Sequence, residues 1–245
     1  MKRKSKIVLV IIIVIIVSLF IWNRGTVKFA LTHKSWDNIS YENFIIYYPP
    51  DYQYSEELNT WAKERYLVFC ELLDVFRVEW PDEKVITFYV FNDFENGRDY
   101  GLKLGFALRR TNTIYTRYNQ TRGHELVHIV TNYLNSGHFL HSSLINEGIA
   151  VCYDFSDRDF DELSRFYLFN DDYEVDIFGD NFREHQYAYY FGGSFVKYLI
   201  NTYSMDKFLE FYSQDGLDES ESFIEYYGKD QKTLYNEWVN YLKGG

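Results

Sequence analysis

The apolar positions along the chain recur with two different spacings. A return every three or four residues predicts helices, and short continuous apolar runs predict buried strands. The predicted helices cover residues 55–76, 121–134, 142–155 and 185–203, and the predicted strands cover residues 43–48, 84–91, 106–109 and 113–118. We therefore expect an α+β fold, in which a small mixed sheet and the long helix 55–76 pack against the helix 121–134. A helical C-terminal part is expected to close the other side of a cleft.

The run Ile7–Trp22 holds 16 residues without a charge. At about 1.5 Å per residue a helix of this length spans about 24 Å, slightly less than the hydrocarbon core of a bilayer. Lys6 and Arg24 can snorkel to the interfaces. The basic residues before the run favour a cytoplasmic N-terminus, and no A-x-A-like cleavage site follows. We expect an uncleaved signal anchor in the cell membrane with the body outside the cytoplasm; a cleaved signal peptide is the alternative.

These segments suggest four parts of the chain. We expect a cytoplasmic basic tail over residues 1–6, a transmembrane anchor over 7–22, a stalk over 23–40 and one folded domain over 41–245, which holds any functional site. The net charge of −11 disfavours nucleic acid as a partner. The two cysteines, Cys70 and Cys152, match no zinc or redox spacing, and are expected to be buried thiols, with a disulfide between them as the alternative. The oligomeric state is left open.

The helix 121–134 contains the sequence His-Glu-Leu-Val-His at residues 124–128. Because each residue turns a helix by about 100°, His124 and His128 lie on one face, and Glu125 flanks the same edge. The opposite arc of the helix carries apolar residues, among them Leu126, Ile129 and Val130. This is the H-E-x-x-H spacing, in which two imidazoles bind zinc and the glutamate serves as general base. We expect one Zn²⁺ per chain; a helix with two core histidines and no metal is the alternative.

A catalytic zinc site needs a third protein ligand and keeps a fourth position for water. Glu147 is the first candidate, because it stands in the otherwise apolar helix 142–155, within Asn-Glu-Gly-Ile-Ala at residues 146–150. His138 and His141 are rival ligands, and a surface role for Glu147 is also open. Leu134 occupies the position where a metzincin has its third histidine, which excludes that class.

The two sequences HELVH and NEGIA together resemble those of the gluzincin metallopeptidases, and among them the small peptidase MA-like domains. The glutamate of the second sequence lies 19 residues after the second histidine, similar to the zinc aminopeptidase branch. The weaker similarity of the flanking regions extends the resemblance over about residues 41–243. It implies that His124, His128 and Glu147 bind zinc and that Glu125 is the general base.

The same resemblance implies a tyrosine that binds the oxyanion from a later helix. The run Tyr-Tyr-Phe-Gly at residues 189–192 suggests Tyr189, with Tyr187 and Tyr190 as competitors, or else a purely structural aromatic face. The aminopeptidase run Gly-x-Met-Glu-Asn is absent, so endopeptidase cleavage is the better expectation. In some gluzincins an aspartate four residues after the ligand glutamate orients a histidine; here Val151 stands there, and Asp154 is a possible substitute.

The sequence thus predicts a membrane-anchored, extracytoplasmic zinc metallopeptidase that acts on peptides or proteins. Zinc-activated water would attack the peptide carbonyl while Glu125 takes its proton. A sheet edge at residues 113–118 would suit an extended peptide substrate. The alternative is an anchored ectodomain that binds zinc for binding or sensing and hydrolyses nothing.

Overall fold

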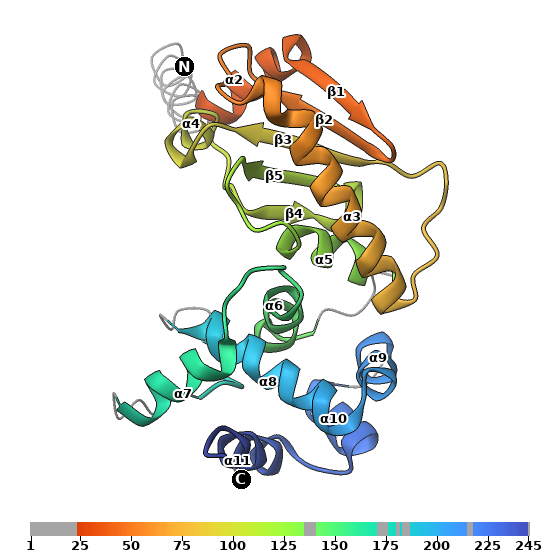
Figure 1. The fold of residues 1–245 in the computed structure, drawn as a ribbon, viewed down its shortest axis with the longest axis vertical. Helices are drawn as coiled ribbons and strands as arrows, with labels where there is room; N and C mark the ends of the chain where they lie inside the picture. Colours follow the sequence, from red (N-terminus) through yellow and green to blue (C-terminus); the bar gives the residue numbers. More distant parts are fainter. Residues whose placement is uncertain are drawn as a thin grey trace, which may run out of the picture. The chain divides into compact units, whose positions relative to one another are not determined.

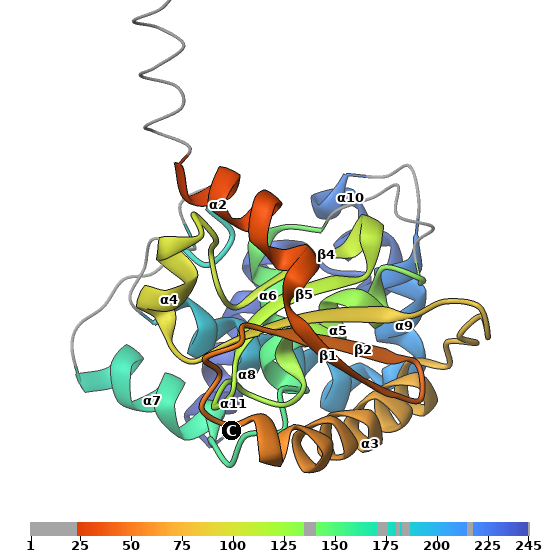
Figure 2. The same cartoon turned by 90° about the horizontal axis from the view of Figure 1, so that it is seen from above.

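The computed structural model describes residues 24–134, 141–170, 176–179, 182, 187–214 and 218–244. These residues form two compact units, shown in Figures 1 and 2. Unit 1 comprises the chain up to residue 63 together with residues 83–106 and 112–120, and unit 2 comprises residues 64–82, 107–111 and 121–245. Each unit is described by itself.

Unit 1 is built on a mixed sheet with the strand order β1-β2-β3-β5-β4 (Figure 1). The strands are β1 (Asp37–Tyr41), β2 (Phe44–Tyr48), β3 (Ile86–Phe91), β4 (Phe106–Leu108), whose last two residues belong to unit 2, and β5 (Thr113–Arg117). Strands β1 and β2 form an antiparallel hairpin, whereas β2, β3 and β5 run parallel. Parallel strands are generally covered on both faces, and β2 and β3 fit this because their side chains are almost all apolar or aromatic on either face.

The two faces of the sheet are covered differently. On one face the buried Phe88 meets Trp61, with ring centroids 5.4 Å apart. On the other face Tyr47, Tyr89 and Tyr115 lie at matched positions of β2, β3 and β5 and stack in a row, each pair with centroids 5.3 Å apart. We call these three residues the tyrosine ladder.

Helix α2 (Arg24–Thr32) and the short η1 (His33–Ser35) cover the tyrosine ladder. Phe29 of α2 contacts the rings of both Tyr89 and Tyr115 edge-on. Trp36, which follows η1, is buried against Phe91. The predicted stalk is therefore corrected: residues 24–40 are a folded part of unit 1, because their aromatic side chains cover one face of the sheet.

Three further elements begin in unit 1: η2 (Ser55–Glu57), α3 (Leu58–Phe76) and α4 (Phe94–Asp99). Helix α3 continues into unit 2 from Glu64 onward. Helix α4 lies in a stretch for which the sequence analysis predicts neither a helix nor a strand. Its first turn is stabilised by Asp93, whose carboxylate accepts a hydrogen bond from the backbone N–H of Asn96.

Unit 2 is helical. It contains η3 (Arg109–Thr111), α5 (His124–Thr131), α6 (Ser143–Cys152), α7 (Phe160–Asn170), α8 (Ala188–Tyr203), α9 (Met205–Ser213), α10 (Glu219–Tyr227) and α11 (Gln231–Leu242). Side chains of Ser204, Asp218 and Asp230 cap α9, α10 and α11 by accepting backbone N–H groups. Helix α7 falls in an acidic stretch to which the sequence assigns no element.

A buried polar cluster joins three helices of unit 2. Ser194 of α8 donates to the Asp161 carboxylate of α7 at 2.7 Å and accepts the indole N–H of Trp238 from α11 at 2.9 Å. Lys197 and Tyr241 complete the pairing of the same carboxylate. Because the buried carboxylate is fully paired, the cost of removing it from water is offset, and the cluster stabilises the packing of the three helices.

The prediction of a transmembrane helix is corrected. Across the described ranges, no helix combines the length and the apolar composition that crossing a membrane requires. Helix α3 has 19 residues, but it carries Lys63, Glu64 and Arg65 in its first half. The fold class that included a transmembrane helix and the localisation in the cell membrane are therefore not retained. Residues 7–22, where the anchor is predicted, lie outside the described residues.

Helices α6 and α8 approach each other at two glycines. A Cβ added at Gly148 would lie 2.5 Å from the carbonyl oxygen of Gly192, which is backbone and cannot rotate away. We expect Gly148→Ala to lower the free energy of unfolding by about 1–3 kcal/mol, the usual cost of overpacking, as measured by denaturant titration. Gly228→Asn is the control, because that residue ends α10 in the left-handed conformation with open space around it. An equal loss in both variants would contradict the close packing.

Candidate metal centre

Helix α5 begins where its backbone meets the end of α6. The N–H of Gly123 donates to the carbonyl of Asp154 at 3.1 Å, and a Cβ at Gly123 would collide with the carbonyl oxygen of Tyr153. Only glycine allows this contact. The sequence predicts a longer helix, over 121–134, but the tight contact at Gly123 sets the start of α5 at His124.

The structure brings His124, His128 and Glu147 together within unit 2. The Nε2 atom of His124 lies 3.3 Å from Oε2 of Glu147, and Nε2 of His128 lies 3.5 Å from the same oxygen. The two imidazole rings are nearly perpendicular, with centroids 5.0 Å apart. Glu147 and His128 are buried, and His124 is largely so.

These distances match the requirements of a small divalent cation. One potential ligand atom from each residue lies within 4.8 Å of the others. A tetrahedral zinc ion with bonds of about 2.05 Å holds neighbouring ligand atoms about 3.3 Å apart. The two distances to Glu147 agree with that spacing, and two imidazole nitrogens with one carboxylate oxygen form a known ligand set of catalytic zinc. The three residues therefore have both the chemistry and the spacing to hold such an ion.

The rival third ligands have different positions. Both ring nitrogens of His141 are engaged elsewhere: Nδ1 lies 3.2 Å from Oε2 of Glu219, and Nε2 lies 2.9 Å from the carbonyl oxygen of Tyr212. His138 lies outside the described residues. Of the candidates that the structure describes, Glu147 is the one that faces the two histidines.

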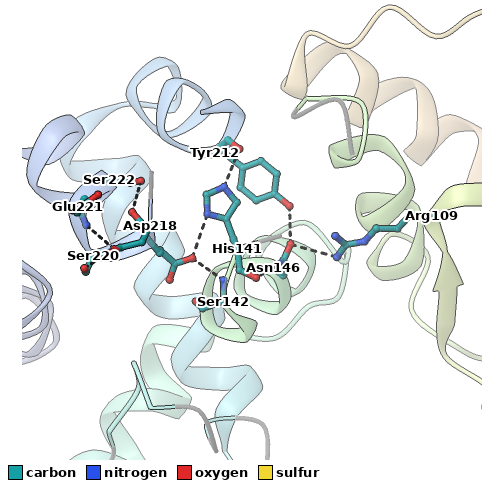
Figure 3. A network of polar contacts seen from close by, with 10 residues as sticks. Arg109, His141, Ser142, Asn146, Tyr212, Asp218, Ser220, Glu221 and Ser222 are labelled. Carbon is teal, nitrogen blue, oxygen red and sulfur yellow. Dashed lines mark hydrogen bonds and ion pairs between the residues drawn. The ribbon is translucent and has the colours of Figure 1, made fainter. Parts of the chain in front are cut away.

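A polar network holds the first turn of α6, which carries Glu147 (Figure 3). The buried side chain of Asn146 accepts hydrogen bonds from the hydroxyl of Tyr212 at 3.0 Å and from Nη2 of Arg109 at 3.3 Å, and it donates to the carbonyl of His141. Burial raises the pKa of Tyr212, so its hydroxyl remains a donor at neutral pH. The hydroxyl also reaches Thr131 at 3.3 Å, which links α9 to α5.

Glu219 extends this network to the start of α10. Its Oε2 accepts the backbone N–H of Ser142 at 2.7 Å, at the N-terminus of α6, in addition to the contact with His141. A carboxylate at this position also interacts favourably with the helix dipole. The sequence analysis did not identify Arg109, Tyr212 or Glu219 as part of the site, and no motif or spacing in the sequence would have found them.

The three competing tyrosines differ clearly in their contacts. The ring of Tyr189 lies 6.1 Å from the ring of His124, and its side chain is exposed. Tyr187 instead stacks on Tyr167 at 3.5 Å, and Tyr190 stacks on the same ring at 5.9 Å. Tyr189 is therefore the one of the three that lies beside the metal-ligand candidates.

Glu125 is buried in the first turn of α5, between the two histidines in sequence. Its position on the helix, about 100° from His124, follows from helical geometry. Asp154, in contrast, does not substitute as an orienting carboxylate. It is paired with Arg158 and accepts the backbone N–H of Ser156 at 2.8 Å.

The two cysteines are both free thiols, so the alternative of a disulfide is wrong. Cys70 is exposed, contrary to the expectation of a buried thiol, because it lies on an outward face of α3. Burial raises the pKa of Cys152 to about 12, which keeps it protonated and unreactive at neutral pH.

Comparison with known proteins adds no assignment to this geometry. No protein-family model matches the chain, and no curated protein is significantly similar to it. The resemblance to gluzincins remains an expectation from the sequence.

Asn146 offers a direct test of the network. We expect Asn146→Ala to reduce the free energy of unfolding by about 1–3 kcal/mol, because it leaves the buried carbonyl of His141 without its donor and Tyr212 without one acceptor. Asn236→Ala, at an exposed position of α11, serves as the control and should change stability by less than about 0.5 kcal/mol. Similar losses in both variants would show that the network contributes nothing specific.

Proposed function

We propose that the protein is a zinc-dependent metallopeptidase with one Zn²⁺ per chain. The observation that carries this proposal is the convergence of His124, His128 and Glu147 at the spacing of a tetrahedral ion. Imidazole nitrogen and carboxylate oxygen in this ratio favour zinc over calcium or magnesium, which prefer oxygen ligands alone. The buried Glu125, which lies in the helical turn between the two histidines, supplies the general base that hydrolysis also needs.

Each residue has a separate role in this proposal. His124, His128 and Glu147 would hold the ion, which when bound lowers the pKa of water to about 7 and polarises a carbonyl group. Glu125 would take the proton of the attacking water and return it to the leaving amine. Tyr189 would donate a hydrogen bond to the oxyanion, an interaction typically worth about 3 kcal/mol. Its exposed position beside His124 supports this role.

The proposed substrates are peptides or proteins cleaved at internal bonds. The chain lacks the Gly-x-Met-Glu-Asn run that holds a free amino terminus in the aminopeptidases it resembles. An enzyme without this amine-binding run gains no binding energy from the free amino terminus of a substrate. Endopeptidase cleavage is therefore the better proposal.

Glu125→Gln separates catalysis from metal binding. The amide cannot accept the proton of the attacking water, so we expect turnover of a mixed peptide library to fall by at least about 10²-fold. Zinc content, measured by atomic absorption on the full-length chain, should stay at one ion per chain. Activity close to wild type would refute the assignment of the base.

His128→Ala tests the metal ligands. Removing one of three protein ligands should leave the purified full-length chain without stoichiometric zinc, whereas His33→Gln, which changes a histidine in unit 1, should leave the zinc content unchanged. Wild-type zinc content in His128→Ala would rule out this residue as a ligand.

The same experiments distinguish a peptidase from the alternative function, a domain that binds zinc without hydrolysing anything. Stoichiometric zinc in the wild-type chain without cleavage of any library peptide would favour a metal-binding domain that hydrolyses nothing. The complete set of ligands together with Glu125 favours the peptidase, because a domain that only binds metal has no need of a base in that position.

A further inference from the structure

A guanidinium group contacts the metal-ligand candidate His128 from the side opposite its ligating nitrogen. Nη2 of Arg109, in η3, lies 3.2 Å from Nδ1 of His128 and 3.3 Å from Oδ1 of Asn146. All three residues belong to unit 2. Among the described residues no carboxylate is paired with Arg109, although the chain as a whole carries a net charge of −11.

The contact with His128 fixes the roles of its two ring nitrogens. A guanidinium has five N–H donors and no acceptor, so Nδ1 of His128 has to accept and must present its lone pair. In a neutral imidazole the single proton is then on Nε2. That nitrogen is the one that lies 3.5 Å from Glu147 and belongs to the candidate ligand set.

A metal ion requires the opposite arrangement. A ligating Nε2 gives its lone pair to the ion, so the proton moves to Nδ1, which then needs an acceptor. Arg109 offers only donors at that position. Its positive charge also repels a divalent cation nearby, and this repulsion is stronger in a partly buried site than in water. Both effects weaken the binding of a metal ion at His128.

We propose that Arg109 weakens metal binding, because it holds His128 in the tautomer that cannot bind the ion through Nε2. This inference rests on the zinc site of the proposed function. With a single nitrogen, Arg109 occupies the lone pair of Nδ1 and one of the two lone pairs on Oδ1 of Asn146; the hydroxyl of Tyr212 takes the other. When Arg109 moves away, the Asn146 oxygen regains a free lone pair. Arg109 is thus a positioning residue that keeps the affinity for zinc below what the three ligands alone would give.

The test is the zinc affinity of the full-length chain, measured by competition with a chromophoric chelator at fixed pH and ionic strength. Arg109→Met removes both the donor and the charge, and Arg109→Gln also supplies an oxygen that can accept from Nδ1. We expect each variant to bind zinc about ten-fold more tightly than wild type or better, the scale of one charge-assisted hydrogen bond. Arg110→Gln, at the exposed neighbouring position, is the matched control and should change the affinity less than about two-fold.

The outcomes separate this inference from the function on which it rests. Wild-type stoichiometric binding with unchanged or weaker affinity in both Arg109 variants would overturn the restraint and leave the zinc site standing. Equal tightening in Arg110→Gln would attribute the effect to net charge and would also overturn it. Zinc binding that appears only in the Arg109 variants would support it strongly. The absence of zinc from all the proteins would refute both proposals.

Discussion

The centre of unit 2 depends on one buried carboxylate, that of Glu147, held between two imidazoles. A carboxylate withdrawn from water costs several kcal/mol unless charges or hydrogen bonds compensate it. The surrounding structure provides that compensation. Helix α5 presents His124 and His128 one turn apart, and the network around Asn146 fixes the turn of α6 from which Glu147 projects. The effect of a substitution near α5 or the start of α6 should therefore depend on how it changes the surroundings of Glu147.

The sequence predicts the centre of this site well, because its signals are local. His124 and His128 are separated by one helical turn, and Glu147 is an acid in an apolar helix, so each can be identified within a few residues. The supporting residues have no such signal. Arg109 and Tyr212 lie 37 and 66 residues from Asn146 along the chain, and only the folded chain brings them together. The run Tyr-Tyr-Phe-Gly already suggests Tyr189 over its neighbours, and the fold adds that the other two tyrosines stack on Tyr167.

The fold, too, can be predicted from the sequence only where the signals are local. The apolar strands β2 and β3 follow directly from their composition, whereas β1 was missed because its residues are mostly exposed and polar. The predicted stalk was wrong because Phe29 and Trp36 belong to no regular apolar spacing, and nothing local reveals that they pack against Tyr89 and Phe91 of the sheet. Helix α4 begins with a capping hydrogen bond that the backbone N–H of Asn96 donates to Asp93, a contribution of about 1 kcal/mol that apolar spacing does not reveal.

The contact between Gly148 and Gly192 has a mechanical consequence. Gly148 adjoins Glu147, and Gly192 lies one turn beyond Tyr189 on α8. Where backbone packs against backbone, α6 and α8 cannot come closer or slide past each other at this point without a clash. The backbone positions of Glu147 and Tyr189 are therefore held at a nearly constant separation. A change in the distance between the ends of these two side chains requires rotation of one or both of them.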